Sequence, residues 1–202
     1  ALPICKIPVK FADARKLDRL CNGAAHQGVA AFAAAHEYAE LDDIFALAQS
    51  RNESPFIVVC DSLEDPHNLG AILRSAEAAG VHGVIIPKRN SVTLNYTVAK
   101  TSAGAIEYVP VVKVANLPAV IDELKARGVW IFGADMDGTD YTSLDYSGSI
   151  ALVIGSEGKG IGRLVREKCD FIASMPMRGK INSLNASVAA GILMFEAAKH
   201  RN

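Results

Sequence analysis

The segment "IALVIGSEGKGIGRLVREKCDFIASMP" (residues 150–176) decides the fold class, because it reads as strand, glycine-rich loop, helix and strand in succession. Its two apolar runs, at 150–155 and 171–176, are short and continuously hydrophobic, as expected for strands buried on both faces. A helical pattern at about 160–168 lies between them. Two strands joined through a helix are typical of a parallel α/β sheet.

The same alternation extends back to about residue 55. Residues 69–79 form an amphipathic helix whose apolar stripe is Leu69, Ile72, Leu73 and Ala76. Trp130 lies in a predicted strand, so we expect it in the core. Further strands are predicted at 56–60, 83–87, 108–112 and 129–133, and further helices near 95–103, 116–127 and 186–200. Residues 55–202 are therefore predicted to form an α/β domain with a mainly parallel sheet flanked by helices.

Residues 1–54 differ in character from the rest of the chain. An alanine-rich apolar stretch precedes an amphipathic helix at about 41–50, and "SRNESP" (50–55) reads as a linker. We interpret residues 1–54 as the C-terminal part of a smaller domain plus its linker. Because the first residue is Ala, we expect the beginning of that domain to precede it.

Composition narrows the class of protein. Half of the 202 residues are hydrophobic and 21% are charged, which suits a packed globular core. No apolar run approaches the ~18 residues of a membrane span, and the four cysteines form no CxxC pair. We therefore expect no membrane segment, disulfide framework or zinc site, and a cytoplasmic location.

The net charge of −1 conceals an uneven distribution. Residues 1–19 carry five basic and two acidic groups, and residues 155–202 carry eight basic and four acidic groups. Residues 55–154 carry seven basic against eleven acidic groups. Basic ends around an acidic middle are compatible with contacts to the phosphates of a nucleic acid, and equally with ordinary solvated surface.

Three polar or glycine-rich loops follow predicted strands, where ligands of open parallel sheets usually bind. In the first, "DSLEDPHNLGAILRSAEAAG" (61–80), Asp65 can cap the helix and Pro66 suits its first turn. Gly70 would leave the guanidinium of Arg74 free to reach toward Asn68. A capped helix with one exposed arginine is the alternative interpretation.

The second loop, "GSEGKGIGRLVREKCD" (155–170), contains four glycines but matches none of the common templates. A P-loop requires GK[ST] after four spacer residues, but Ile161 stands where the lysine after Gly160 is required, and a dinucleotide fingerprint requires glycine at Arg163. A nucleophile elbow is excluded because Ser156 directly follows Gly155. The sequence therefore disfavours nucleotide and serine hydrolases, leaving either a different ligand or a loop that only starts a helix.

The third loop, "NSLNAS" (182–187), places two asparagines and two serines directly before an apolar helix. One such residue is enough to cap a helix, because its side chain accepts from free backbone N–H groups. The other polar side chains indicate a second role at this position.

Three stretches together resemble the motifs of the SpoU (TrmH-type) RNA ribose 2′-O-methyltransferases of the SPOUT superfamily. They are "DPHNLGAILRSAEAAG" (65–80), "LVIGSEGKGI" (152–161) and "MPMRGKINSLNASVAAGILMFEA" (175–197), in the order of the family. The intervening residues 91–117 are most similar to the bacterial branch that methylates a guanosine of 23S ribosomal RNA. In that branch a substrate-binding domain similar to ribosomal protein L30e comes first, and residues 1–54 resemble its C-terminal part.

The resemblance implies a C-terminal deep trefoil knot that forms the pocket for S-adenosylmethionine, and a homodimer packed beside it. The implied cofactor contacts are Gly155, Met175 and Leu184, and the implied catalytic positions are Asn68, Arg74, Glu157, Ser183 and Asn185. No metal is implied, and RNA is the implied partner. Glu157 would hold Arg74 or the backbone.

The chemistry leaves several alternatives open. Arg74 is either the group that activates the ribose hydroxyl, or a group that stabilises developing negative charge while water accepts the proton. Arg178 and Lys180 are candidates for phosphate contacts or simply solvated charges. A methyltransferase acting on transfer RNA and a noncatalytic RNA-binding member of the fold remain alternative functions.

Overall fold

The computed structural model describes residues 9–21, 23, 25–31 and 36–201. The chain divides into two compact units, Ala1–Ala35 and His36–Asn202, which we describe separately. In the first unit, helix α1 (Ala14–Leu20) begins at Asp13, whose side chain accepts from the Lys16 N–H at 2.7 Å. The end of the expected alanine-rich stretch, residues 32–35, lies outside the described residues.

The second unit is built on one sheet. Among the described residues, six strands pair in the order β3-β2-β1-β5-β4-β6, and all five pairings are parallel. The parallel α/β architecture is therefore confirmed. The strands are β1 (Phe56–Cys60), β2 (Gly83–Pro87), β3 (Val111–Val114), β4 (Trp130–Asp140), β5 (Ile150–Ile154) and β6 (Phe171–Ser174).

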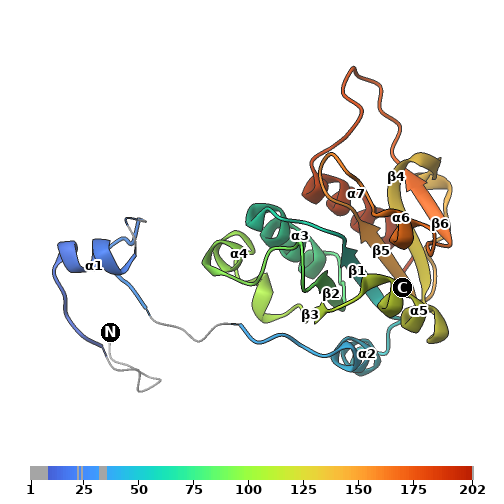
Figure 1. The fold of residues 1–202 in the computed structure, drawn as a ribbon. Helices are drawn as coiled ribbons and strands as arrows, with labels where there is room; N and C mark the ends of the chain where they lie inside the picture. Colours follow the sequence, from blue (N-terminus) through green and yellow to red (C-terminus); the bar gives the residue numbers. More distant parts are fainter. Residues whose placement is uncertain (1–8, 22, 24, 32–35, 202) are drawn as a thin grey trace. The chain divides into compact units, whose positions relative to one another are not determined.

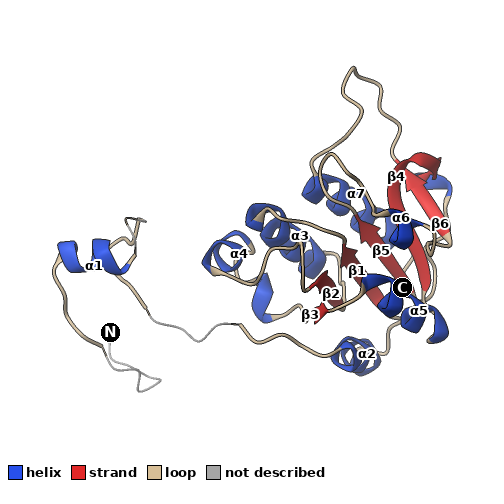
Figure 2. Ribbon diagram, in the orientation of Figure 1, coloured by secondary structure: helices blue, strands red, loops and turns tan. Residues whose placement is uncertain are grey.

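Helices cover both faces of this sheet (Figures 1 and 2). Along β1, Phe56, Val58 and Cys60 face one core while Ile57 and Val59 face the other, so the strand is apolar throughout. The first core contains α3 (Pro66–Ala78), α4 (Tyr96–Thr101), the 3-10 turn η1 (Ala105–Glu107) and α7 (Ala186–Ala198); the second contains α2 (Leu41–Ser50), α5 (Leu117–Ala126) and α6 (Arg163–Arg166). The predicted stripe of residues 69–79 is fully buried in the first core.

The structure departs from the predicted elements most in and around β4. This strand continues to Asp140 instead of ending at 133, because its polar second half pairs with β6 beyond an irregularity between Ala134 and Thr139. The expectation that Trp130 lies in the core is wrong. Its side chain is 55% exposed at the first position of β4, where it contacts Phe171 with ring centroids 5.8 Å apart.

Helix α2 packs on the sheet although it precedes the predicted domain start. Its residues Ile44 and Ala48 are buried, and a Cβ added to Gly83 would lie 2.4 Å from Ile44 Cδ1. Glycine at the start of β2 therefore lets α2 approach the sheet closely. Residues 36–54, which include the predicted helix at 41–50 and most of the predicted linker, thus belong to the second compact unit.

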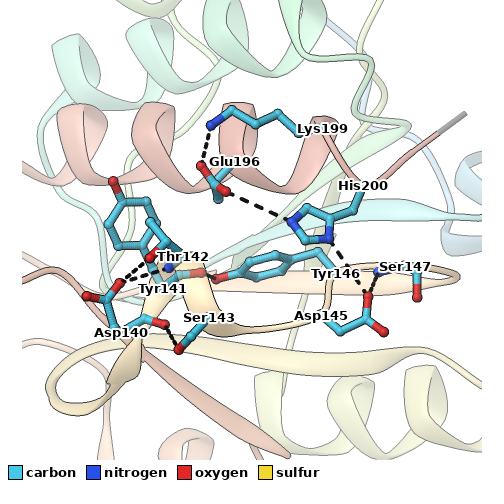
Figure 3. A network of polar contacts seen from close by, with 10 residues as sticks. All are labelled: Asp140, Tyr141, Thr142, Ser143, Asp145, Tyr146, Ser147, Glu196, Lys199 and His200. Atoms are coloured by element: carbon cyan, nitrogen blue, oxygen red, sulfur yellow. Dashed lines mark hydrogen bonds and ion pairs between the residues drawn. The ribbon is translucent and has the colours of Figure 1, made fainter.

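The C-terminal end of α7 is fixed at the amino ends of the strands by a polar network (Figure 3). Tyr146, fully buried after the 3-10 turn η2 (Tyr141–Ser143), donates its hydroxyl to the Tyr141 carbonyl at 2.9 Å. His200 packs edge-on against the Tyr146 ring, with centroids 5.5 Å apart, and lies 3.8 Å from Asp145 Oδ1. Burial raises the pKa of Tyr146 well above its usual range, so the phenol stays protonated and keeps its donor.

Candidate active site

The loops after β1 and β5 are joined directly to each other at the carboxyl edge of the sheet. Asp61, the first residue after β1, accepts from the Gly162 N–H at 2.7 Å and from the Ser62 hydroxyl at 3.0 Å. Its side chain is 7% exposed, so this bond fixes the two loops relative to each other. Asp61 was not among the predicted site residues, although an aspartate directly after a buried strand is a visible signal.

The glycine-rich loop folds back on itself. Ser156 and Gly160 exchange backbone hydrogen bonds of 3.1 and 2.9 Å. A Cβ on Gly155 would lie 2.1 Å from the Gly160 carbonyl carbon, so no larger residue fits at the loop start. Gly160 also adopts a positive φ of 64°, which favours glycine. These glycines create a narrow turn whose side chains, including Glu157 and Lys159, point outward.

Three predicted polar residues meet at the end of this loop. Asn68 Nδ2 donates to Glu157 Oε1 at 3.1 Å, and Asn185 Nδ2 donates to Asn68 Oδ1 at 2.9 Å and to Glu157 Oε1 at 2.5 Å. Glu157 Oε1 also accepts from the Ala186 N–H at 3.2 Å. One carboxylate therefore gathers α3, the glycine loop and the start of α7 into a single cluster. We call Asn68, Glu157 and Asn185 the amide–carboxylate cluster.

Asn185 has two structural tasks at once. Its Oδ1 accepts from the backbone N–H groups of Ser187 and Val188, at 3.0 and 3.2 Å, and so caps α7. Its Nδ2 meanwhile serves the amide–carboxylate cluster. The asparagine-rich stretch before the helix therefore both starts α7 and shapes the site, as its composition indicated.

Two predicted site residues lie outside this cluster. Among the described residues, Arg74 makes no hydrogen bond or ion pair; its side chain is exposed on α3. Ser183 is exposed in the loop between β6 and α7. Glu157 thus holds the backbone at Ala186 and not Arg74. The expected role of Gly70 is corrected too, because a Cβ there would lie 1.8 Å from Thr101 Oγ1, so Gly70 serves the packing of α3 against α4.

A pocket of about 280 Å³ lies beside the glycine loop. Its walls come from three segments: β4 at residues 134–136, the loop at 154–160, and the connection between β6 and α7. All three predicted cofactor contacts, Gly155, Met175 and Leu184, line it, together with Ser183 and Glu157. The sequence analysis missed Met136 and Met177, which also line it.

A second pocket of about 440 Å³ adjoins the first and is more polar. The two share Ser156, Glu157 and Lys159, so one strip of the glycine loop separates them. Asn68 lines the second pocket. Among the described residues, no group of three or more His, Cys, Asp or Glu side chains is arranged to hold a metal ion, and no helix is long and apolar enough to cross a membrane.

A parallel sheet with two joined pockets beyond its carboxyl edge defines an α/β protein whose site lies between β1 and β5. Within that class the chain belongs to the SpoU rRNA Methylase family, which matches residues 55–195. Residues 4–39 match a second family, described as RNA 2′-O ribose methyltransferase substrate binding.

Individual relatives agree with this assignment. The chain is 54% identical over 197 residues to a Bacillus subtilis protein of the TrmH family of tRNA/rRNA methyltransferases, covering 97% of this chain and 79% of the relative. The SpoU methyltransferase AviRb of Streptomyces viridochromogenes, solved with its cofactor AdoMet, is 30% identical with a TM-score of 0.72. That match covers 81% of this chain and 65% of AviRb.

A third similar protein acts on another class of RNA. The TrmH/SpoU tRNA modifying enzyme of A. aeolicus is 29% identical with a TM-score of 0.66, over 79% of this chain and 84% of that one. The relatives therefore agree on RNA methylation, while their names include both ribosomal and transfer RNA.

Proposed function

We propose that the protein transfers a methyl group from S-adenosylmethionine to a ribose 2′-hydroxyl of RNA. The observation that carries this proposal is the amide–carboxylate cluster, built at the wall between the two pockets. The match of residues 4–39 to a 2′-O ribose methyltransferase substrate-binding family supports the ribose as acceptor. AviRb, which was solved with AdoMet, supports the cofactor.

The first pocket fits S-adenosylmethionine in size and chemistry. Its volume lies near the lower end of the ~300–1,000 Å³ usual for ligand sites, and its lining mixes methionine and leucine side chains with exposed loop backbone. The cofactor would be held by Gly155, Met175 and Leu184. Their backbone N–H and carbonyl groups would supply most of the hydrogen bonds to its polar groups. Gly155 is required there by the closure of the loop itself.

When bound, S-adenosylmethionine supplies an electrophilic methyl on a sulfonium, so transfer forms one O–C bond, breaks one S–C bond and releases one proton. The residues must mainly position the hydroxyl and assist proton loss. Asn68 is 5% exposed and held at both ends of its amide, so it presents a rigid edge to the second pocket. Ser183 lines the first pocket, and in this proposal it contacts the reacting groups.

Arg74 is the remaining candidate for the chemistry. Its exposed guanidinium takes part in no bond within this chain's described residues, so it is available to a phosphate or to a second copy's site. It would orient a phosphate or stabilise developing oxyanion charge. Comparing the pH dependence of the methylation rate in the wild type and in Arg74→Ala tests whether Arg74 also assists proton removal.

The substrate we propose is a guanosine of 23S ribosomal RNA, on the resemblance of residues 91–117 to that bacterial branch. The family description, which names rRNA, agrees with it. Transfer RNA is the second candidate, favoured by the similarity to the A. aeolicus enzyme. In this proposal residues 1–35 are the end of an L30e-like substrate-binding domain, and residues 36–54 connect it to the sheet on which α2 packs. The exposed Arg178 and Lys180 contact phosphates, and the enzyme works in the cytoplasm.

We also infer a homodimer and a trefoil knot. Val188, Ile192 and Phe195 on α7 are 50%, 36% and 51% exposed, an apolar surface that a second copy would cover. For the knot, the support is that the segment after β6 lines the same pocket as β4 and the glycine loop before continuing into α7. A monomer mass by light scattering at micromolar concentration would contradict the dimer.

The test of the proposed function is calorimetry with S-adenosylhomocysteine, without added metal, followed by methylation of in vitro transcribed 23S rRNA. We expect binding and incorporation of methyl groups at a 2′-oxygen. No binding at millimolar ligand would indicate a noncatalytic member of the fold. Binding with incorporation only into transfer RNA would select the second candidate.

A further inference from the structure

The second pocket is not lined by any of the three predicted cofactor contacts. It is lined by Ser62, Glu64, Asn68, Asn90, Glu157 and Lys159. Because it shares Ser156, Glu157 and Lys159 with the first pocket, a nucleoside bound in it would lie near the amide–carboxylate cluster. Its volume of about 440 Å³ lies within the ~300–1,000 Å³ of small-ligand sites.

The lining of this pocket decides which base it accepts. No described residue that lines it is aromatic, so recognition by these residues comes from hydrogen bonds at the base edge and not from stacking. Glu157 and Asn68 are already paired within the cluster. Asp65 uses Oδ1 to accept from the His67 N–H at 2.8 Å. Among the described residues, Glu64 makes no hydrogen bond or ion pair, and its carboxylate is exposed in the pocket.

We propose that the second pocket binds the base of the target nucleotide and that Glu64 selects guanine there. This proposal rests on the proposed function. A carboxylate offers two acceptor oxygens and no donor. Guanine presents two adjacent N–H donors, at N1 and N2, that match such a pair. Adenine presents an acceptor at N1, which a carboxylate repels, and uracil and cytosine present no adjacent pair of ring and exocyclic donors.

Lys159 and Asn90, which also line the pocket, complete the match. Guanine O6 and N7 are acceptors, which lysine and amide donors serve well. The Lys159 ammonium lines both pockets, so it is also near the ribose. Glu64 is therefore a specificity-determining residue, whereas the amide–carboxylate cluster serves every nucleotide alike.

The test measures base selectivity separately from methyl transfer. The chain saturated with S-adenosylhomocysteine is titrated with the four ribonucleoside 5′-monophosphates by saturation-transfer NMR. We expect guanosine monophosphate to bind at least about tenfold more tightly than the other three. In Glu64→Gln, which mixes a donor with an acceptor, this preference should fall about tenfold, the scale of one good base contact. Glu77→Gln, an exposed carboxylate on α3 outside the pocket, is the matched control.

The outcomes separate this inference from the proposed function. Equal binding of the four nucleotides, no binding of any, or unchanged selectivity in Glu64→Gln would overturn the role of Glu64, whatever the methylation result. Failure of S-adenosylhomocysteine to bind would instead remove the proposed function. Inosine monophosphate lacks the N2 amine of guanosine monophosphate. It should therefore bind the wild type more weakly than guanosine monophosphate does, and it should bind Glu64→Gln as tightly as guanosine monophosphate does.

Discussion

The amino edge of the sheet, where its strands begin, and the carboxyl edge, where they end, differ in how their polar groups are satisfied. At the amino edge, side chains and backbone groups satisfy one another: Arg201 donates to the Gly148 carbonyl at 2.9 Å and to the Ser54 carbonyl, and its guanidinium lies 4.8 Å from the centre of the Phe56 ring. At the carboxyl edge, polar groups line two pockets. Helix α7 connects the edges, capped in the site at Asn185 and fixed by Arg201 just beyond its other end.

This difference teaches which substitutions should affect stability and which should affect chemistry. Groups at the amino edge are satisfied within the fold, so removing one costs free energy of unfolding. Groups at the carboxyl edge that face the pockets are available to ligands. Replacing those should change activity while the fold persists.

The largest expected effect is on stability, at the amino edge. Tyr146→Ala removes a fully buried aromatic side chain and leaves a cavity against Phe132, whose ring centroid is 4.8 Å away. The free energy of unfolding should fall by about 3–5 kcal/mol, as for other aromatic truncations in cores. Urea unfolding followed by circular dichroism measures it, with Tyr108→Ala, at a 69% exposed site, as the control. A loss below 1 kcal/mol would mean that this edge is not a stabilising centre.

The next effect concerns chemistry alone. Arg74→Ala should leave the melting temperature and the affinity for S-adenosylhomocysteine nearly unchanged, because Arg74 lies outside the buried stripe of α3. Single-turnover methylation of 23S rRNA should fall about a hundredfold or more. Lysine should rescue little, since it lacks the planar donor geometry of arginine. Arg163→Ala, another exposed arginine, is the control; near-normal turnover in Arg74→Ala would remove this residue from the mechanism.

Asn185 contributes to stability by capping α7 and to the site through the amide–carboxylate cluster. Two variants separate these contributions. Asn185→Ser keeps a capping oxygen but loses the Nδ2 donors to Asn68 and Glu157, so methylation should fall about tenfold with stability nearly intact. Asn185→Ala loses the cap as well and should cost a further ~1 kcal/mol of unfolding free energy. Parallel melts and methylation assays test this. Equal stability of the two variants would show that the cap contributes nothing.

The smallest expected effect is the pH dependence of the free energy of unfolding that arises at the amino edge. His82 is fully buried, accepts from the Phe56 N–H at 2.9 Å and lies 2.9 Å from Glu53 Oε2. Burial lowers the pKa of His82, partly offset by the Glu53 hydrogen bond. The folded state therefore favours the neutral imidazole. The contribution of His82 to the free energy of unfolding is fully present above the unfolded pKa of about 6.5, and it is lost as the pH falls below that value.

Unfolding free energies between pH 7.5 and 5.5 measure this term. The loss should not exceed about 1.4 kcal/mol per pH unit, the limit for one proton. His82→Asn, which keeps an acceptor for the Phe56 N–H without titrating, should flatten the slope. An unchanged slope in that variant would assign the pH dependence to other groups.

Sequence predicted the buried strands best. The bounds of β1 and β2 agree with prediction because continuous burial on both faces leaves a continuous apolar run. The extension of β4 was not predictable, since "ADMDGTD" has no strand pattern and pairs only because β6 lies beside it. Trp130 was misplaced because an apolar run does not reveal where helices stop covering a sheet.

In the site too, features set by neighbouring residues were easier to predict than bonds between residues far apart in the sequence. The helix start at Asp65 follows from local chemistry and was predicted, whereas the composition of residues 182–187 indicated a cap for α7 without identifying Asn185 as that cap. The bond between Asn68 and Glu157 joins residues 89 positions apart, so no spacing argument yields it; the family resemblance brought those residues together. Asp61 was missed because its partner, the Gly162 N–H, is a backbone group that no motif records.

The insertion of β5 between β1 and β4 has a consequence for how the chain is made. During synthesis β1 can pair with β2, yet its other edge must wait for β5, which leaves the ribosome much later. Such distant parallel pairing is slow to form, because the connecting chain must be ordered first. Until β5 is synthesised, the nascent chain exposes the free edge of an apolar strand, and such edges favour aggregation.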